Sequence, residues 1–266
     1  MSVPVAVLLG ILQGLTEFLP VSSSGHLALV QHFFGVDSPG VTFEVLVHFG
    51  TALAVIVYFR RRIGAIVVAV LRFLFRRAYD RDDAGLGLHL LVGTVPAGIV
   101  GVLFGSAVEA AFGSPGLVSV FLLVTGALLW LTRRFAPGTR PAGGIRDAAL
   151  IGVAQAVAIL PGMSRSGWTV STGLGLRLKP GAAAEFAFLL AVPVILGATA
   201  LSLGEAFGSG SPPGAAAISG TAAAFLSAIP AIFVLLKVVT AGRLYRFSYY
   251  CWIAGAVGLV FTAVRG

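Results

Sequence analysis

The chain contains little charge and a single cysteine. Charged residues make up 11% of its 266 residues, hydrophobic residues make up 58%, and the mean hydropathy is +0.99. Soluble domains carry about 25% charged residues, so this composition excludes a soluble globular protein. The one cysteine, Cys251, excludes a disulfide framework and a metal cluster of thiolates. We therefore expect an all-α polytopic membrane protein, because a helix satisfies its own backbone polar groups in lipid.

Acidic residues are scarcer than basic ones. Ten Asp and Glu stand against 18 Lys and Arg, which gives a formal net charge of +8. A basic balance is compatible with a nucleic-acid partner. Here, however, the basic residues gather in short stretches between apolar segments, as membrane topology signals do. This distribution argues against nucleic acid as a partner and favours a location in a membrane.

One of the few acidic residues lies within an apolar segment near the amino terminus. A charged side chain at membrane depth costs about 2.5–3.5 kcal/mol on insertion scales, so it marks a candidate functional site. The segment reads Gln13-Gly-Leu-Thr-Glu17-Phe-Leu-Pro-Val-Ser22-Ser-Ser-Gly25-His26.

A second copy of this segment follows 142 residues later. Both copies consist of an apolar stretch, a proline, a short loop rich in hydroxyl groups and a second apolar stretch. The repeat indicates two halves, residues 1–135 and 145–266, within one membrane domain, residues 1–266. The second copy reads Gln155-Ala-Val-Ala-Ile-Leu-Pro-Gly-Met-Ser164-Arg165-Ser166-Gly167-Trp168 and aligns without a gap.

The arms of each copy are too short to cross a bilayer singly. Residues 26–34 form a helix of about 14 Å, half of a hydrocarbon core of about 30 Å. We predict re-entrant helical hairpins at residues 3–34 and 147–178, each followed by three transmembrane helices. The predicted crossings are residues 42–59, 85–104, 117–132, 182–203, 215–236 and 245–264, with a connection over residues 106–116.

An odd number of crossings in each half predicts two inverted-topology repeats. The Lys and Arg positions agree with this topology, since it places the four most basic stretches on one side of the membrane. The loops on the opposite side then contain no Lys or Arg. Because basic loops stay on the cytoplasmic side, we expect these stretches to be cytoplasmic. Seven Lys and Arg lie within residues 60–85, four within 133–147, two within 177–179 and three within 237–246.

A row of small residues runs along one predicted crossing at helical spacing. It consists of Gly93, Ala97, Gly101 and Gly105. Such rows allow helices to approach closely in lipid. We expect packing along this row within the chain or between two copies, which admits a homodimer.

The two hydroxyl-rich loops suit an anionic ligand. Residues 22–25 and 164–167 each precede a helix amino terminus, where unpaired amides and the positive dipole end attract phosphate. Arg165 adds a forked cation that matches phosphate oxygens. Glu17 suits general acid–base chemistry or a divalent cation, and His26 could transfer a proton or attack phosphorus. A serine hydroxyl beside a base is the other candidate nucleophile.

Simpler structural interpretations stay open at this stage. The serines could act only as helix caps and turn residues, and a pair between Glu17 and Arg165 could only join the two hairpins. Glu44 and His48 lie four residues apart on one face of a predicted crossing. They either line the cavity or pack as a polar pair.

The two motifs resemble those of the undecaprenyl-diphosphate phosphatase family, integral-membrane enzymes linked to bacitracin resistance. The resemblance covers essentially the whole chain. It implies hydrolysis of a polyprenyl diphosphate to the polyprenyl phosphate and inorganic phosphate, with a divalent cation such as Mg²⁺ or Ca²⁺. It also implies the inverted-repeat fold and a location in the plasma membrane. The residues that carry it are Gln13-Gly-Leu-Thr-Glu17, Pro20-Val-Ser-Ser-Ser-Gly-His26 and Pro161-Gly-Met-Ser-Arg-Ser-Gly-Trp-Thr169.

Carried over by position, the resemblance implies catalytic roles for Glu17, Ser23, His26 and Arg165. Glu17 is the essential acid and the expected metal ligand, and Arg165 clamps phosphate. Ser23 is favoured over His26 as the nucleophile. Gln13 replaces a glutamate of other members, so Glu17 is the sole acidic ligand expected from its helix. Substrate-binding positions are expected at Gln13, Ser22, Ser24, Gly25, Ser164, Ser166, Gly167 and Thr169.

Two other classes of function compete with a phosphatase. Inverted repeats with broken helices at the membrane midplane are also a transporter architecture, so a lipid-phosphate flippase or transporter is the alternative. A structural scaffold is the third class. Phosphate release in detergent separates the enzyme from the transporter, because net transport requires two sealed compartments.

Overall fold

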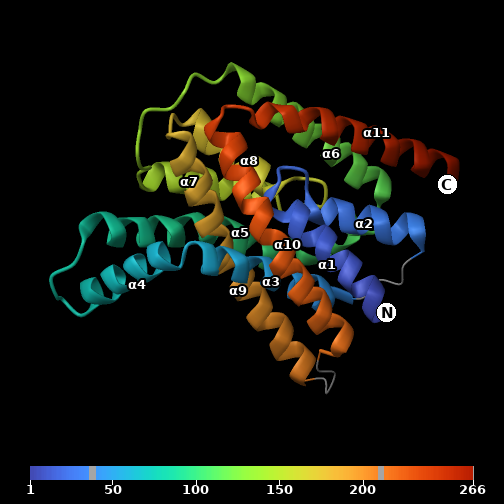
Figure 1. Ribbon diagram of the computed structural model, residues 1–266, viewed down its shortest axis with the longest axis horizontal. Helices are drawn as coiled ribbons and strands as arrows, with labels where there is room; N and C mark the ends of the chain where they lie inside the picture. Colours follow the sequence, from blue (N-terminus) through green and yellow to red (C-terminus); the bar gives the residue numbers. More distant parts are fainter. Residues whose placement is uncertain (36–39, 209–212, 266) are drawn as a thin grey trace.

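The computed structural model describes residues 1–35, 40–208 and 213–265 (Figure 1). Across these residues the secondary structure is helical, and the β-type pairing consists of an isolated bridge between Arg140 and Leu178. The predicted all-α class is confirmed. The elements are α1 (Val3–Phe18), α2 (Ser23–Phe34), α3 (Gly40–Tyr58), α4 (Arg60–Leu74), α5 (Arg81–Phe112), α6 (Pro115–Leu131), η1 (Thr132–Arg134), α7 (Ile145–Val157), α8 (Arg165–Gly175), α9 (Pro180–Gly208), α10 (Ala215–Thr240), η2 (Leu244–Arg246) and α11 (Phe247–Arg265).

Five helices of the described chain are long and apolar enough to cross a membrane. The expected multi-pass membrane protein is therefore confirmed. Val3–Phe18 and Thr42–Tyr58 are apolar but shorter, so the predicted crossing at residues 42–59 does not reach the length of the other five. The five long segments are Arg81–Phe112, Pro115–Arg134, Pro180–Gly208, Ala215–Thr240 and Leu244–Val264.

Helix α5 departs from the predicted layout. The sequence predicts a connection over residues 106–116, but α5 continues to Phe112 with a kink at Phe104 (φ −122°, ψ 17°). Three alanines in this stretch favour the helix, since alanine has the highest helix propensity. The break comes later, where the Ser114 side chain caps α6 by accepting a hydrogen bond from the Leu117 amide at 3.4 Å.

Glycines bring three helices into close contact. A Cβ atom added at Gly10 of α1 would lie 2.1 Å from the Gly220 carbonyl oxygen of α10. One added at Gly50 of α3 would lie 2.4 Å from the Thr221 carbonyl oxygen, also in α10. These distances admit no larger side chain, so α1 and α3 pack against the α10 backbone, as helices in lipid do. This packing holds the carboxyl-terminal end of α1 in the core around Phe18.

The α1–α2 turn and the α7–α8 turn are in direct contact. Ser22 Oγ accepts a hydrogen bond from the Gly162 amide at 3.0 Å, and Ser166 Oγ donates to the Leu19 carbonyl oxygen at 3.2 Å. Gly162 has a φ of +97°, which favours glycine. A Cβ atom added at Gly25 would lie 3.0 Å from the Gly162 Cα atom. The small residues of both motifs therefore let the two turns meet.

The row of small residues on α5 has two environments. An added Cβ atom at Gly93 would lie 3.1 Å from the Ala148 carbonyl oxygen and 2.9 Å from Leu190. Gly101 and Gly105 border open space, since no described atom outside their own helix backbone lies within 4 Å of an added Cβ atom. Within this chain, the expected close packing is therefore confined to the first half of the row.

The linker between the two halves, which contains Arg140, forms backbone hydrogen bonds with the α8–α9 connection. The Arg140 amide donates to the Arg177 carbonyl oxygen at 3.1 Å, and the Lys179 amide donates to the Arg140 carbonyl oxygen at 2.8 Å. Arg140 Nη2 also donates to Asp147 Oδ2 at 2.5 Å. Burial raises the pKa of the Asp147 carboxyl group, but the hydrogen bonds from Arg140 and the Gly144 amide lower it more, so the pKa lies below its ordinary value.

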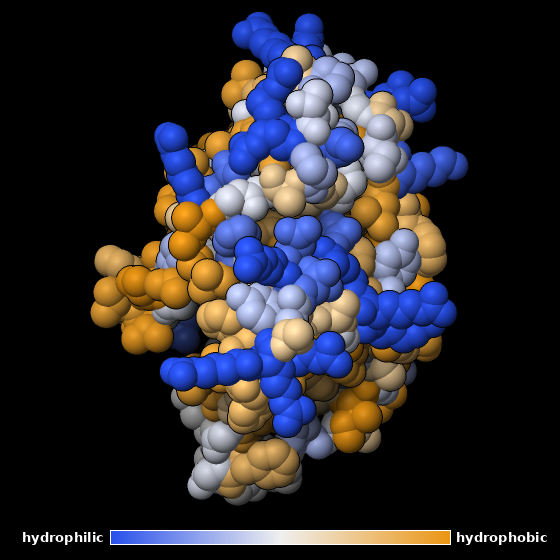
Figure 2. All heavy atoms as spheres, turned by 90° about the vertical axis from the view of Figure 1, so that its left-hand side faces the viewer, coloured by the Kyte–Doolittle hydropathy of each residue, from blue (hydrophilic) through white to orange (hydrophobic). Residues whose placement is uncertain are grey.

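Exposed basic side chains gather at one end of the molecule. The α4–α5, α6–α7 and α8–α9 connections lie toward the left in Figure 1. Figure 2 looks onto this end and shows hydrophilic side chains gathered between hydrophobic flanks. The exposed basic residues of these connections are Arg76, Arg77, Arg133, Arg134, Arg140, Arg177 and Lys179.

Candidate active site

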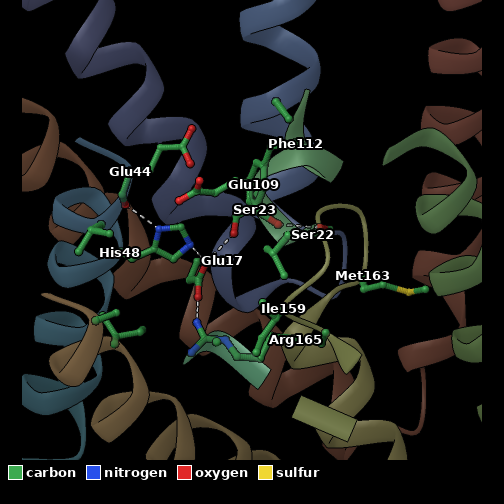
Figure 3. A pocket seen from close by; sticks show the side chains of 18 of the residues that line it. Glu17, Ser22, Ser23, Glu44, His48, Glu109, Phe112, Ile159, Met163 and Arg165 are labelled. Carbon is green, nitrogen blue, oxygen red and sulfur yellow. Dashed lines mark hydrogen bonds and ion pairs between the residues drawn. The ribbon is translucent and has the colours of Figure 1, made fainter. Parts of the chain in front are cut away.

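A cavity of about 850 Å³ lies beside the two turns (Figure 3). It has a polar end, built mainly by both motifs, and an apolar side along α5 and α9. The polar residues that line it are Glu17, Ser22, Ser23, Ser24, Gln31, His32, Glu44, His48, Glu109, Gln155, Ser164 and Arg165. The apolar side includes Ala97, Gly101, Gly105, Val108, Phe112, Val194, Ile195 and Ala198.

Both carboxylate oxygens of Glu17 have partners. Oε1 forms an ion pair with Arg165, and Oε2 accepts hydrogen bonds from Gln13 Nε2 at 2.8 Å and from Ser23 Oγ at 2.5 Å. The Glu17 side chain is 3% exposed and the Arg165 side chain is 18% exposed, so protein shields the pair. Removal of one partner of a buried ion pair costs about 3–5 kcal/mol. This pair therefore holds the two motifs together.

The arrangement joins a base, a hydroxyl group and a fixed cation. The Ser23 hydroxyl donates to a carboxylate, which is how a base activates a nucleophile. The Arg165 guanidinium has five N–H donors, and the ion pair with Glu17 uses only part of them. Ser23 begins α2 and Arg165 begins α8, so two helix amino termini, which favour anions, lie at the cavity. These groups suit the transfer of a phosphoryl group.

The imidazole that reaches Glu17 belongs to His48. Its Nδ1 atom lies 2.7 Å from the Glu44 carbonyl oxygen, and its Nε2 atom lies 3.5 Å from Glu17 Oε2. Because a carbonyl oxygen only accepts, Nδ1 carries a hydrogen, and Nε2 is left to receive a proton on the side of Glu17. The His48 side chain is 26% exposed and lines the cavity. His48 is therefore placed for proton transfer.

His26 lies elsewhere, although the sequence makes it a catalytic candidate. Its Nδ1 atom lies 2.8 Å from the Ser22 carbonyl oxygen, and its Nε2 atom lies 2.7 Å from the Tyr250 hydroxyl group. Its ring stacks on the Tyr250 ring with a centroid distance of 5.5 Å. His26 is not among the described residues that line the cavity. The structure thus joins α2 to α11 through His26 rather than bringing it to Glu17.

The other predicted residues fall into two groups. Ser22 and Ser164 line the cavity with Ser24, and they also cap α2 and α8 by accepting from backbone amides at 3.3 Å and 3.1 Å. These two serines therefore cap a helix and also line the cavity, and their role in substrate binding stays a prediction. The residues of the second group are not among the described residues that line the cavity. They support the site instead, by contacting Glu17, by packing between the two turns or by bonding within the first turn of α8. This group consists of Gln13, Gly25, Ser166, Gly167 and Thr169.

Several cavity residues have no assigned role in the sequence reasoning. Glu44 and His48, left open between cavity and packing, both line the cavity (Figure 3). The sequence could have indicated a role for Gln155, because Gln155 aligns with Gln13 in the repeat. Nothing in the sequence indicates a role for Glu109, since the sequence predicts a connection over residues 106–116. In the structure α5 continues through these residues and brings Glu109 to the cavity.

The described residues do not build a closed metal site. No group of three or more His, Cys, Asp or Glu side chains among them could hold a metal ion. The oxygens of Glu17, the expected ligand, already have protein partners. Glu44 and Glu109 extend into the same cavity from α3 and α5 (Figure 3). Because Mg²⁺ binds through one or two carboxylates plus substrate phosphates, the cavity fits a cation that a phosphate ligand helps to hold.

Comparisons with known proteins agree with this chemistry. A family model described as "Bacitracin resistance protein BacA" matches residues 6–257, which include both motifs. The chain is similar to proteins named undecaprenyl-diphosphatase from three organisms. It is 46% identical over 263 residues to that of Desulfosudis oleivorans, covering 95% of this chain and 96% of the relative. The identity is 42% over 265 residues for Desulforapulum autotrophicum, with 96% of each chain covered. It is 41% over 261 residues for Korarchaeum cryptofilum, with 96% of this chain and 97% of the relative covered.

Proposed function

Since this chain belongs to the bacitracin resistance protein BacA family, we propose that it is an undecaprenyl-diphosphatase. It is an integral-membrane enzyme that hydrolyses undecaprenyl diphosphate to undecaprenyl phosphate and inorganic phosphate. The product is the lipid carrier used in cell-envelope glycan synthesis, so the reaction recycles it. The observation that carries this function is the contact of Glu17 with Ser23 and Arg165 at the meeting point of the two motifs.

Ser23 is the nucleophile in this proposal. Its Oγ atom forms a bond to the terminal phosphorus while the bond from that phosphorus to the bridging oxygen breaks, which releases undecaprenyl phosphate. The Ser23 proton passes to Glu17, to which Ser23 already donates a hydrogen bond at 2.5 Å. Water then attacks the phosphoserine and the Oγ–P bond breaks. Glu17 returns a proton to Ser23, and His48 takes a proton from the water and passes it to solvent.

Arg165 stabilises the charge that develops on the transferring phosphoryl group. Phosphoryl transfer depends mostly on positioning and on electrostatic stabilisation of the equatorial oxygens. A guanidinium shielded from solvent suits this task, because its interactions are stronger at low dielectric. Arg165 is shielded and lies next to Ser23 through their common partner Glu17, which supports this role.

We also propose a divalent cation as cofactor. Glu17 is the ligand that the sequence predicts, and among the described residues Glu44 and Glu109 are the other carboxylates that line the cavity. Phosphate oxygens of the substrate would complete the coordination, and the cation would neutralise charge on the diphosphate. Loss of phosphate release in a chelator, with recovery on addition of Mg²⁺ or Ca²⁺, tests this part of the proposal.

The proposed topology keeps the two inverted repeats with re-entrant hairpins. Helices α1, α2, α7 and α8 contain 16, 12, 13 and 11 residues, or about 24, 18, 20 and 16 Å, against a hydrocarbon core of about 30 Å. The contact between their turns supports hairpins that enter from opposite sides and meet inside the membrane. The connections that carry the exposed basic residues are then cytoplasmic. A homodimer stays a prediction.

The lipid tail leaves the site along the apolar side of the cavity. Gly101 and Gly105 border open space on α5 and line the cavity. Glycine has no side chain, so these positions leave room for a hydrocarbon chain beside Val108 and Phe112, which line the same side. This proposal gives the second half of the small-residue row a role in substrate binding.

Gly101→Leu should weaken binding of the tail. The added side chain occupies cavity space, so the KM for undecaprenyl diphosphate should rise by about tenfold with kcat little changed, the signature of lost uniform binding. A prenyl diphosphate with a short tail should be less affected. Gly98→Leu is the matched control, since Gly98 is also an α5 glycine in open space but is not a described cavity residue. Equal KM values for Gly101→Leu and Gly98→Leu would contradict the proposed path.

The proposed function is tested by phosphate release from undecaprenyl diphosphate with the purified chain in detergent. An enzyme releases phosphate without a sealed bilayer, whereas a flippase or transporter does not. We expect turnover that depends on Glu17. Absence of phosphate release by a folded, purified protein would exclude the phosphatase.

A further inference from the structure

Gln155 is buried at the cavity without a partner for its side-chain amide. The residue is 1% exposed and lines the cavity from the last turn of α7. Neither its Nε2 atom nor its Oε1 atom has a hydrogen-bond partner among the described residues. Buried polar groups are nearly always hydrogen-bonded, so an unpaired donor and acceptor at a cavity wall indicate a ligand that completes them.

The repeat explains why the Nε2 group of Gln155 is unpaired, although the Oε1 atoms of both Gln13 and Gln155 lack a partner among the described residues. Gln155 aligns with Gln13, whose Nε2 atom donates to Glu17 Oε2 four residues later. The residue four positions after Gln155 is Ile159, which also lines the cavity and offers no acceptor. The two halves thus share the glutamine, but only the first half supplies its partner.

We infer that Gln155 is a diphosphate-binding residue. Its Nε2 group donates to a phosphate oxygen, and its Oε1 atom accepts from a protonated phosphate oxygen or from the water that enters with it. The surroundings support a phosphate as the ligand, because Ser164 and Arg165 line the same cavity and both are phosphate-binding residue types. This inference rests on the proposed function, since it assigns a further contact to the same substrate.

Gln155→Met and Gln155→Glu test the inference. Methionine keeps the size of the side chain and removes both hydrogen-bonding groups, so the KM for undecaprenyl diphosphate should rise by about tenfold, a loss of about 1.4 kcal/mol. Glutamate keeps the shape but adds a negative charge facing phosphate, so KM should rise by about a hundredfold. The melting temperature of Gln155→Met should equal or exceed that of the wild type, because the substitution removes an unpaired buried amide.

Ser171→Ala is the matched control. Ser171 is 1% exposed and its Oγ atom also has no partner among the described residues, but it does not line the cavity. Its removal should leave KM and kcat unchanged. Unchanged KM in Gln155→Met would overturn the inference, and so would a rise in KM accompanied by a lower melting temperature, which would assign Gln155 to packing. Both outcomes leave the proposed function standing as long as the wild type releases phosphate.

Discussion

Ser23→Ala should lower phosphate release by at least about 10³-fold, and Glu17→Gln should do the same. Ser23 Oγ donates a hydrogen bond to Glu17 Oε2 at 2.5 Å, so Ser23 gives the proton and Glu17 accepts it in the same transfer. Alanine removes the group that attacks phosphorus, whereas glutamine retains the shape of Glu17 but cannot take the proton. The measurement is kcat for undecaprenyl diphosphate in detergent.

The double variant distinguishes a catalytic pair from two independent residues. Residues that act as a unit give non-additive losses, so the Ser23→Ala, Glu17→Gln double variant should be no slower than the slower single variant. A multiplied loss would contradict the joint role, and near-normal turnover of Ser23→Ala would remove Ser23 as the nucleophile. Glu185→Gln is the control, because Glu185 pairs with Arg62 at 3.0 Å outside the cavity. It should retain turnover.

Thermal stability separates the two single variants. Glu17→Gln leaves Arg165 shielded without its ion partner, which destabilises the fold by about 3–5 kcal/mol. Ser23→Ala leaves that ion pair intact and removes only a hydrogen bond, so its melting temperature should stay closer to that of the wild type. Loss of turnover in Ser23→Ala is therefore the cleaner evidence for chemistry.

His48→Ala should reduce kcat by about 10²-fold, the range of general acid–base catalysis. His48 Nε2 lies 3.5 Å from Glu17 Oε2 and the side chain lines the cavity. The variant should also lose one limb of the pH dependence of kcat, which a purely structural role does not predict. Wild-type turnover in His48→Ala would exclude this residue from proton transfer.

His26→Phe should lower the stability of the protein and leave its turnover nearly unchanged, unlike His48→Ala. The His26 ring bonds to the Tyr250 hydroxyl group at 2.7 Å and stacks on its ring. Phenylalanine keeps the stacking but loses both hydrogen bonds, so the melting temperature should fall while kcat changes by a few-fold at most. A greater loss of kcat in His26→Phe than in His48→Ala would indicate that His26, the histidine predicted from the sequence, is the catalytic one.

The candidate site was predictable wherever it lies in one continuous motif. Glu17 and Ser23 are six residues apart on either side of a proline, so their proximity follows from a single turn. Arg165 followed from the repeat, because two matching loops at helix starts suit the same anion. Glu109 was not predictable, since it depends on α5 continuing past the kink at Phe104.

The sequence alone determined the membrane class, the two motifs and the acid, hydroxyl and guanidinium groups, because composition and local spacing act within short stretches of chain. Only the tertiary structure decided which imidazole meets Glu17 and that Gln155 lacks a partner. Both depend on how separate helices are rotated and packed against one another. Residues 22 and 162 touch across 140 positions of sequence, and no local pattern specifies such a contact.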